Sequence, residues 1–182
     1  TGAAGAMRRQ TLPFIRDALK ERDAAAASLL DLGAGTGGFL ATVKDNWPQL
    51  KLTALDLSPA YLNKSRASLG RWKDVDYVQA NAEETGLPDA SFDIITAVYL
   101  FHEIPPAVRE TVAAEAARLL KPGGVFILAD TIQFGDEPGF DILLENFPRG
   151  FHEPYYDSFC RTDLDALMGA HGLERCGEKI AF

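Results

Sequence analysis

The chain has 182 residues, of which 47% are hydrophobic, 18 are basic and 26 are acidic, so its formal net charge is -8. This size and composition predict one globular domain with a sizeable core and exclude collagen, coiled-coil and disordered classes. The excess of acid disfavours nucleic acid as a partner. Because no apolar run approaches the roughly 20 residues of a membrane helix and no signal-peptide pattern is present, we expect an intracellular protein without a membrane partner.

Apolar runs rich in Leu, Ile and Val alternate with longer helical patterns along the chain. Each run stays apolar on both faces, which is typical of parallel strands covered by helices. The sequence therefore predicts an α/β fold with a doubly wound, Rossmann-like, mostly parallel sheet. The expected strands are Ser28–Leu32, Lys51–Asp56, Val75–Gln79, Phe92–Val98, Val125–Asp130 and Leu173–Ala181.

Helical patterns fill the connections between these runs. A leading helix is expected within residues 1–22, where Met7, Leu12, Ile15 and Leu19 can share one face. The other expected helices are Gly37–Asn46, Pro59–Gly70, with Ser58 as its N-cap, Pro106–Leu120, ended by Lys121-Pro122-Gly123-Gly124, and Thr162–His171.

The connection after the fifth expected strand is unusually long and rich in aromatic residues and proline. Long connections in compact domains are usually functional, so we interpret residues 136–160 as the substrate side of a single domain that spans residues 1–182. Cys160 and Cys176 fit neither a redox pair nor a zinc cluster, and we expect ordinary thiols and no metal.

The stretch LLDLGAGTGGF, residues 29–39, fits two cofactor patterns, G-x-G-x-x-G and D-x-G-x-G-x-G, the second of which comprises Asp31, Gly33, Gly35 and Gly37. Gly33, Gly35 and Gly38 fit the dinucleotide pattern G-x-G-x-x-G, and Asp56, at the end of the second strand, suits ribose hydroxyls in either case. Asp31 favours another ligand, because its carboxylate would repel a pyrophosphate. S-adenosylmethionine, whose methionyl ammonium and sulfonium are cationic, suits this acid better.

The chain resembles a class I S-adenosylmethionine-dependent methyltransferase over essentially its whole length. Five segments stand in that family's order: LLDLGAGTG (29–37), ALDLS (54–58), NAEETGLP (81–88), FDIITAVYLFHEI (92–104) and LLKPGG (119–124). The alternative of a nicotinamide-dependent reductase of the short-chain type is disfavoured, because the sequence contains no Tyr-x-x-x-Lys pair.

The resemblance implies a role for each matching residue. The glycines Gly33, Gly35 and Gly37 would pack the methionyl part of the cofactor, Asp31 would lie near its ammonium and Asp56 would hold the ribose. The remaining expected cofactor contacts are Leu57, Asn81, Ala82, Glu83 and Tyr99. Asn81 stands where the family most often has Asp, yet its amide oxygen can still accept a hydrogen bond from adenine.

Two His-Glu pairs are candidates for the acceptor side. Methyl transfer needs an aligned, deprotonated nucleophile, so His102 or His152 could act as a general base, and Glu103 and Glu153 could contact the substrate. His102 could equally be a loop residue that closes the cofactor pocket. His171, at a helix end, is expected to cap it.

Aromatic residues crowd the long connection. Tyr155 and Tyr156 are candidate substrate contacts, and with Phe147, Phe151 and Phe159 they could wall an acceptor pocket or anchor the connection to the core. The FHEPYY string resembles one in a microbial and plastid-type group of methyltransferases whose acceptors are mostly unassigned. We expect a cytoplasmic location, or the plastid stroma if the chain comes from a photosynthetic eukaryote.

The leading hypothesis is methyl transfer to a small-molecule acceptor, and two alternatives stay open: a non-catalytic S-adenosylmethionine-binding module and a protein methyltransferase. Family members usually add an antiparallel seventh strand between strands five and six. We expect that strand to be missing here, with Leu173–Phe182 either beside strand five or apart from it.

Overall fold

In the computed structural model, which describes residues 5 and 8–181, the sheet has five parallel strands in the order β3-β2-β1-β4-β5. They are β1 (Ser28–Leu32), β2 (Lys51–Asp56), β3 (Val75–Gln79), β4 (Phe92–Val98) and β5 (Leu120–Ala129). The doubly wound parallel α/β fold and the bounds of its first four strands are confirmed. The chain proceeds outward from β1 through β2 to β3 in one direction and from β4 to β5 in the other. The carboxyl ends of the neighbouring strands β1 and β4 therefore form the switch point where such folds bind ligands.

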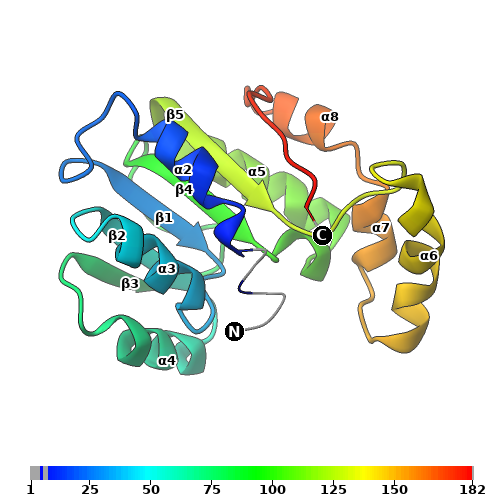
Figure 1. The fold of residues 1–182 in the computed structure, drawn as a ribbon, viewed down its shortest axis with the longest axis horizontal. Coiled ribbons are helices and arrows are strands. Elements are labelled where there is room, and N and C mark those ends of the chain that lie inside the picture. The colour runs from blue at the N-terminus through cyan, green and yellow to red at the C-terminus, as the bar shows by residue number, and fades with distance from the viewer. Residues whose placement is uncertain (1–4, 6–7, 182) are drawn as a thin grey trace.

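Helices cover both faces of this sheet (Figure 1). The helices α2 (Leu12–Ala18), α3 (Gly38–Asn46) and α4 (Pro59–Leu69) pack over the face that carries Leu29 and Ile94, whereas α5 (Pro106–Leu119) packs over the face that carries Leu30 and Ile95. Alternate residues of each strand therefore enter two separate hydrophobic clusters. This accounts for strands that are apolar on both faces.

The remaining helices gather beyond β5, on one side of the molecule (Figure 1). They are the short η1 (Phe101–Glu103) and η2 (Pro138–Phe140), followed by α6 (Asp141–Gly150), α7 (Tyr156–Cys160) and α8 (Leu164–Gly169). The long connection of residues 136–160 is thus largely helical. His171 follows the C-cap of α8, and its Nε2 lies 2.9 Å from Glu110 Oε2, which ties this end to α5.

Local sequence signals set several helix ends correctly. Ser58 caps α4, because its Oγ accepts a hydrogen bond from the Tyr61 backbone N–H at 3.3 Å. In the leading segment, Ile15 and Leu19 are buried as expected, while Met7 lies outside the described residues. The two cysteines are free thiols.

The start of β5 differs from the prediction. The structure begins this strand at Leu120, which pairs with Phe92, and the next pair joins Ile94 to Val125. Residues 121–124 therefore bulge between two paired positions, and Gly123 takes a positive φ of 74° there. The predicted turn forms, but inside the strand rather than before it.

The predicted sixth strand is wrong. Residues 173–181 form no strand, and within the described chain β5 is the edge of the sheet. The segment instead crosses the leading helical region, where Lys179 Nζ donates a hydrogen bond to Gln10 Oε1 at 2.6 Å. Most of its residues are exposed, and two consecutive pairs, Glu174-Arg175 and Glu178-Lys179, carry charge, so the segment lacks the two apolar faces that a parallel strand buries.

Candidate functional site

The glycine loop, residues 33–37, joins β1 to α3 and is held by backbone hydrogen bonds to β2. Ala34 N donates to Leu55 O at 2.9 Å, and Gly35 N donates to Asp56 Oδ2 at 2.8 Å. A Cβ at Gly35 would meet no atom within 4 Å, so this part of the loop borders open space. A Cβ at Gly37 would lie 2.6 Å from Ser65 Oγ, so this glycine lets α3 approach α4.

Asp31 is a buried acid directly below the glycine loop. Its side chain accepts a hydrogen bond from Thr96 Oγ1 at 2.7 Å, and the residue is only 2% exposed. Burial raises the pKa of Asp31 to about 7, against the opposing effects of the Thr96 bond and the Arg8 charge. A carboxyl group held there costs folding energy, which is typical of a ligand-binding position.

A cavity of about 60 Å³ lies beside Asp31 and the glycine loop, and Arg8 forms part of its wall. Arg8 Nη1 lies 3.1 Å from the position of a Cβ at Gly38, the first residue of α3. The arginine thus places a cation at the N-terminus of this helix. Sequence reasoning missed Arg8, because nothing in the string MRRQ distinguishes it from a solvated arginine.

Asp56 ends β2 and faces the same edge. It is 8% exposed, and its Oδ1 accepts a hydrogen bond from Ser58 N at 2.8 Å while its Oδ2 accepts the bond from Gly35. Each carboxylate oxygen keeps lone-pair capacity for another donor. Leu57, the next residue, is 67% exposed beside it.

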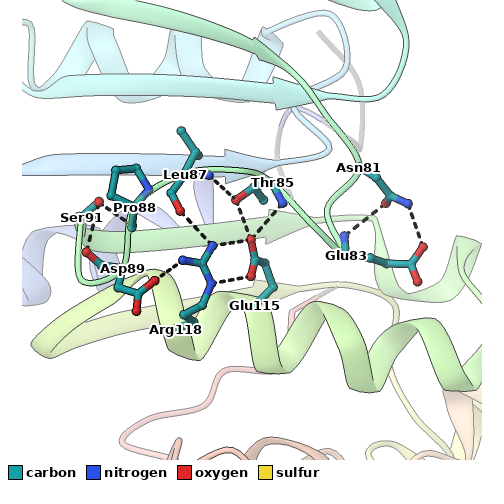
Figure 2. Close-up of polar contacts among 9 residues, drawn as sticks. All are labelled: Asn81, Glu83, Thr85, Leu87, Pro88, Asp89, Ser91, Glu115 and Arg118. Atoms are coloured by element: carbon teal, nitrogen blue, oxygen red, sulfur yellow. Dashed lines mark hydrogen bonds and ion pairs between the residues drawn. The ribbon is translucent and has the colours of Figure 1, made fainter.

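The loop after β3 carries Asn81, Ala82 and Glu83 (Figure 2). Asn81 Oδ1 accepts from Glu83 N at 3.2 Å, and Asn81 Nδ2 donates to Glu83 Oε1 at 2.9 Å. The two side chains are therefore ordered against each other. Asn81 itself is exposed, with acceptor capacity remaining on its amide oxygen.

An ion pair on α5, between buried Glu115 and partly exposed Arg118, anchors the rest of this loop (Figure 2). Glu115 Oε1 accepts from Thr85 N at 2.9 Å and from Thr85 Oγ1 at 2.6 Å, while Arg118 Nε donates to Glu115 Oε2 at 2.8 Å. Arg118 also donates to Leu87 O at 2.9 Å and pairs with Asp89. The bonds from Arg118 and Thr85 lower the pKa of Glu115 to about 2.

Tyr99 follows β4 in an unusual backbone conformation. Its φ is 60°, a left-handed region that aromatic residues rarely adopt, and its N–H donates to Ala129 O at 2.8 Å. Its ring meets that of His102 edge-on at 6.3 Å between centroids. Strained residues of this kind concentrate at functional sites.

His102 is paired with Asp130, an acid that follows β5. His102 Nδ1 lies 2.5 Å from Asp130 Oδ1, and Phe101 N and Thr131 N donate to the same carboxylate at 2.9 and 2.8 Å. The pKa of His102 is raised: burial lowers it, but the bond and charge of Asp130 outweigh that effect. With Nδ1 engaged, Nε2 is the nitrogen left for a substrate proton.

The structure brings the two predicted Glu residues into one electrostatic cluster with His102. Burial and the charges of Glu153, Asp130 and Asp56 raise the pKa of Glu103, while His102 lowers it. Glu153 also helps to raise the pKa of His102. His152 is exposed, so only one of the two predicted histidines is bonded to an acid at this edge.

Arg109 holds together the two backbone segments that carry His102 and Glu153. It is 1% exposed, and its guanidinium donates to Phe101 O at 2.8 Å, Tyr155 O at 2.8 Å, Ser158 Oγ at 3.0 Å and Thr162 Oγ1 at 3.1 Å. One buried cation thus joins η1 to α7. Its place in a helical sequence pattern gave no signal of this role, since three of the four acceptors named above come from a segment about 50 residues away.

The aromatic residues of the long connection divide into two groups. Phe159 is fully buried in the core, whereas Phe147 stacks on Tyr156 with 4.5 Å between centroids and on Phe151 with 4.6 Å. Tyr156 Oη shares a hydrogen bond with Thr131 Oγ1 at 2.8 Å. Tyr156 is 6% exposed and meets the His102 ring edge-on at 6.1 Å.

A larger cavity, about 430 Å³, lies between α5 and α8 and shares no lining residue with the glycine loop. We place the functional site at the smaller cavity, because Asp31 and Asp56 lie at the carboxyl ends of β1 and β2, and His102 and Asp130 follow β4 and β5 at the same edge. Within residues 5 and 8–181, no group of three His, Cys, Asp or Glu side chains is placed to hold a metal ion. No helix in the same part of the chain is long and apolar enough to cross a bilayer.

Comparison with known families and proteins gives consistent matches. Residues 29–124 match the family model described as a methyltransferase domain. The chain is 28% identical over 177 residues to malonyl-[acyl-carrier protein] O-methyltransferase of Geobacter sulfurreducens, covering 94% of this chain and 64% of the relative. It is 31% identical over 147 residues to the ubiquinone/menaquinone biosynthesis C-methyltransferase UbiE of Methylobacterium nodulans, covering 79% of this chain and 57% of that protein.

Solved structures share the fold. The YcgJ protein of Bacillus subtilis superposes with a TM-score of 0.69 at 23% identity, covering 90% of this chain and 68% of that one. Phosphoethanolamine N-methyltransferase 2 of Haemonchus contortus, solved with S-adenosyl-L-methionine, gives 0.67 at 19% identity, covering 90% and 36%. The chain spans 57% to 64% of the two curated relatives named above.

Proposed function

We propose a function from the premise that this chain belongs to the methyltransferase domain family and is a class I S-adenosylmethionine-dependent methyltransferase domain. The proposed activity is transfer of the methyl group to a small-molecule acceptor. The His102–Asp130 pair carries the proposal, because it sets a proton acceptor at the same sheet edge as the glycine loop. The two relatives named above are methyltransferases by name.

The residues at the sheet edge fit S-adenosylmethionine. Asp31 is a buried acid suited to the cofactor's ammonium, and Arg8 with the N-terminus of α3 supplies positive charge suited to its carboxylate. Asp56 retains acceptor capacity for ribose hydroxyls, and Gly35 borders open space. Leu57, Asn81, Ala82, Glu83 and Tyr99 surround the same edge and are proposed as the further cofactor contacts.

The cofactor supplies an electrophilic methyl group on sulfur. His102 Nε2 would accept the proton of the acceptor's hydroxyl, phenol or amine, so that the acceptor could take the methyl group that S-adenosylmethionine would supply, with S-adenosylhomocysteine as the other product. Asp130 holds the imidazole through Nδ1 and stabilises the imidazolium. Glu103, Glu153, Tyr155 and Tyr156 are proposed to border the acceptor, whereas exposed His152 is not proposed as the base.

Equilibrium dialysis against methyl-labelled S-adenosylmethionine, with and without excess NAD, tests the cofactor. We expect saturable binding that NAD does not displace, and binding of NAD alone would overturn the proposal. Incubation of the loaded protein with a metabolite extract and with a peptide pool then follows the label. Label in small molecules supports the proposal, label in peptides favours the protein methyltransferase, and label in neither favours the non-catalytic module.

A further inference from the structure

Exposed apolar side chains concentrate on α6 and its flanks. Five of the eight large hydrophobic residues that are exposed in the described chain lie within residues 140–151. Ile142, Leu143 and Phe151 are 66%, 58% and 60% exposed, while Leu144 is the buried residue of α6. Such a local concentration marks a binding surface more often than a scatter of single residues does.

This surface is continuous with the proposed active site. Phe151 stacks on Phe147, Phe147 stacks on Tyr156, and Tyr156 meets the His102 ring. The exposed fraction falls along this row, from 60% at Phe151 through 36% at Phe147 to 6% at Tyr156. An unbroken row of rings therefore leads from the outer surface of α6 to the proposed base.

The charge around α6 restricts what it can bind. Residues 136–161 contain six acidic residues and two basic ones, Arg149 and Arg161. A nucleic acid, an anionic membrane or an anionic carrier would be repelled by this excess of four negative charges. An uncharged apolar ligand meets no such barrier.

We propose that α6 binds the hydrocarbon tail of the methyl acceptor while the acceptor's reacting group lies at His102. The acceptor is accordingly an amphiphile with a small ionisable head and an uncharged apolar tail that runs along Tyr156, Phe147 and Leu143. This inference rests on the proposed function for the place of the reacting group. Its claim about the tail concerns binding alone.

The affinities of a series of 4-n-alkylphenols test directly whether the surface binds a hydrocarbon tail. Binding of the butyl, hexyl and octyl compounds is followed by calorimetry in the presence of S-adenosylhomocysteine, so no chemistry is needed. A buried methylene contributes about 0.8 kcal/mol, so we expect affinity to rise up to about 4-fold per added methylene while the tail remains on the surface. Affinity that does not change with chain length would overturn the inference.

The variant Ile142→Ser/Leu143→Ser removes the outer part of the surface. We expect a flattened dependence on chain length with unchanged affinity for S-adenosylhomocysteine, because both residues are exposed and distant in sequence from the glycine loop. Ile180→Ser, at an exposed position of the C-terminal segment, is the matched control and retains the full dependence. Equal slopes in the double variant and the wild type would refute the assignment.

Two further measurements distinguish other occupants. Sedimentation velocity that shows a dimer dissociated by Ile142→Ser/Leu143→Ser would assign α6 to a second copy of the chain. Pelleting with phosphatidylcholine vesicles that the same variant abolishes would assign it to a lipid surface. Either result overturns the tail site, whereas failure to bind S-adenosylmethionine would instead overturn the proposed function.

Discussion

The glycine loop is tied to β2 by backbone hydrogen bonds from Ala34 and Gly35, whereas α6 packs on the rest of the molecule chiefly through Leu144. The first region presents backbone groups and two buried acids to the proposed cofactor position. The second presents exposed aliphatic and aromatic side chains. A cofactor that is the same in every member of a fold family can be bound by a rigid, preorganised loop. Acceptors that differ between members are instead bound by side chains on a connection added to the fold.

His102→Ala should have the largest effect on turnover of the variants considered. The effect should be confined to the acceptor region. We expect turnover to fall about 10²- to 10⁴-fold with cofactor affinity unchanged, as for loss of a general base. His152→Ala is the matched control and should stay near wild type, since His152 is exposed. If neither variant alters single-turnover rates, proximity alone carries the chemistry.

The role of His102 as a base also predicts the direction in which the methyl-transfer rate changes with pH. His102 accepts a proton only when neutral, and its pKa is raised, so the wild-type rate should rise with pH through that raised value. Asp130→Asn removes the charge that raises this pKa, so the rising limb should move to lower pH while the maximal rate falls. A limb that stays in place would show that another group titrates.

Asp56→Ala should act on the cofactor region alone. The variant loses a charged acceptor for the ribose and also releases the N–H groups of Gly35 and Ser58. We expect S-adenosylmethionine binding to weaken by at least about 1–3 kcal/mol, measured by calorimetry. Asp56→Asn should lose less, and an unchanged dissociation constant in the alanine variant would remove Asp56 from the site.

Glu115→Gln should have the smallest effect on the site and act through stability. The folded-state pKa of Glu115 is lowered from 4.5 to about 2, so its contribution is fully present above pH 4.5 and is lost as the pH falls towards 2. We expect the variant to lose about 1–3 kcal/mol of unfolding free energy at neutral pH. Its stability should then fall less steeply than that of the wild type over this acidic range.

Urea unfolding at several pH values measures this difference. Glu84→Gln, an exposed substitution in the same loop, is the matched control and should leave the free energy of unfolding nearly unchanged. If Glu115→Gln unfolds with the wild-type pH dependence, the ion pair with Arg118 does not anchor the loop.

Sequence reasoning located the strands β1 to β4 to the residue, because their apolar runs end at turn residues and acids. It placed β5 too late, since a Pro-Gly-Gly string was read as a boundary and not as a bulge. It failed for residues 173–181, where a few apolar residues among charged ones imitate a strand.

The candidate site shows the same division. Asp31 and Asp56 could be found because a motif and a strand end place them. Asp130, Arg8 and Arg109 were not found, because each contacts residues from distant segments. Of these three residues, Asp130 was the easiest to anticipate from the sequence, because it is a further acid at the end of an expected parallel strand. Arg109 would be expected to be solvated, and only the packed structure reveals that it is buried.

The raised pKa of Asp31 means that this carboxyl group can bind or release a proton near neutral pH. With a pKa of about 7 it is partly protonated at neutral pH. A cationic ammonium bound beside it would favour the ionised form, so binding should release a fraction of a proton into the buffer at pH 7. The observed binding heat would then depend on the ionisation enthalpy of the buffer, and cofactor affinity would increase as the solution becomes more alkaline.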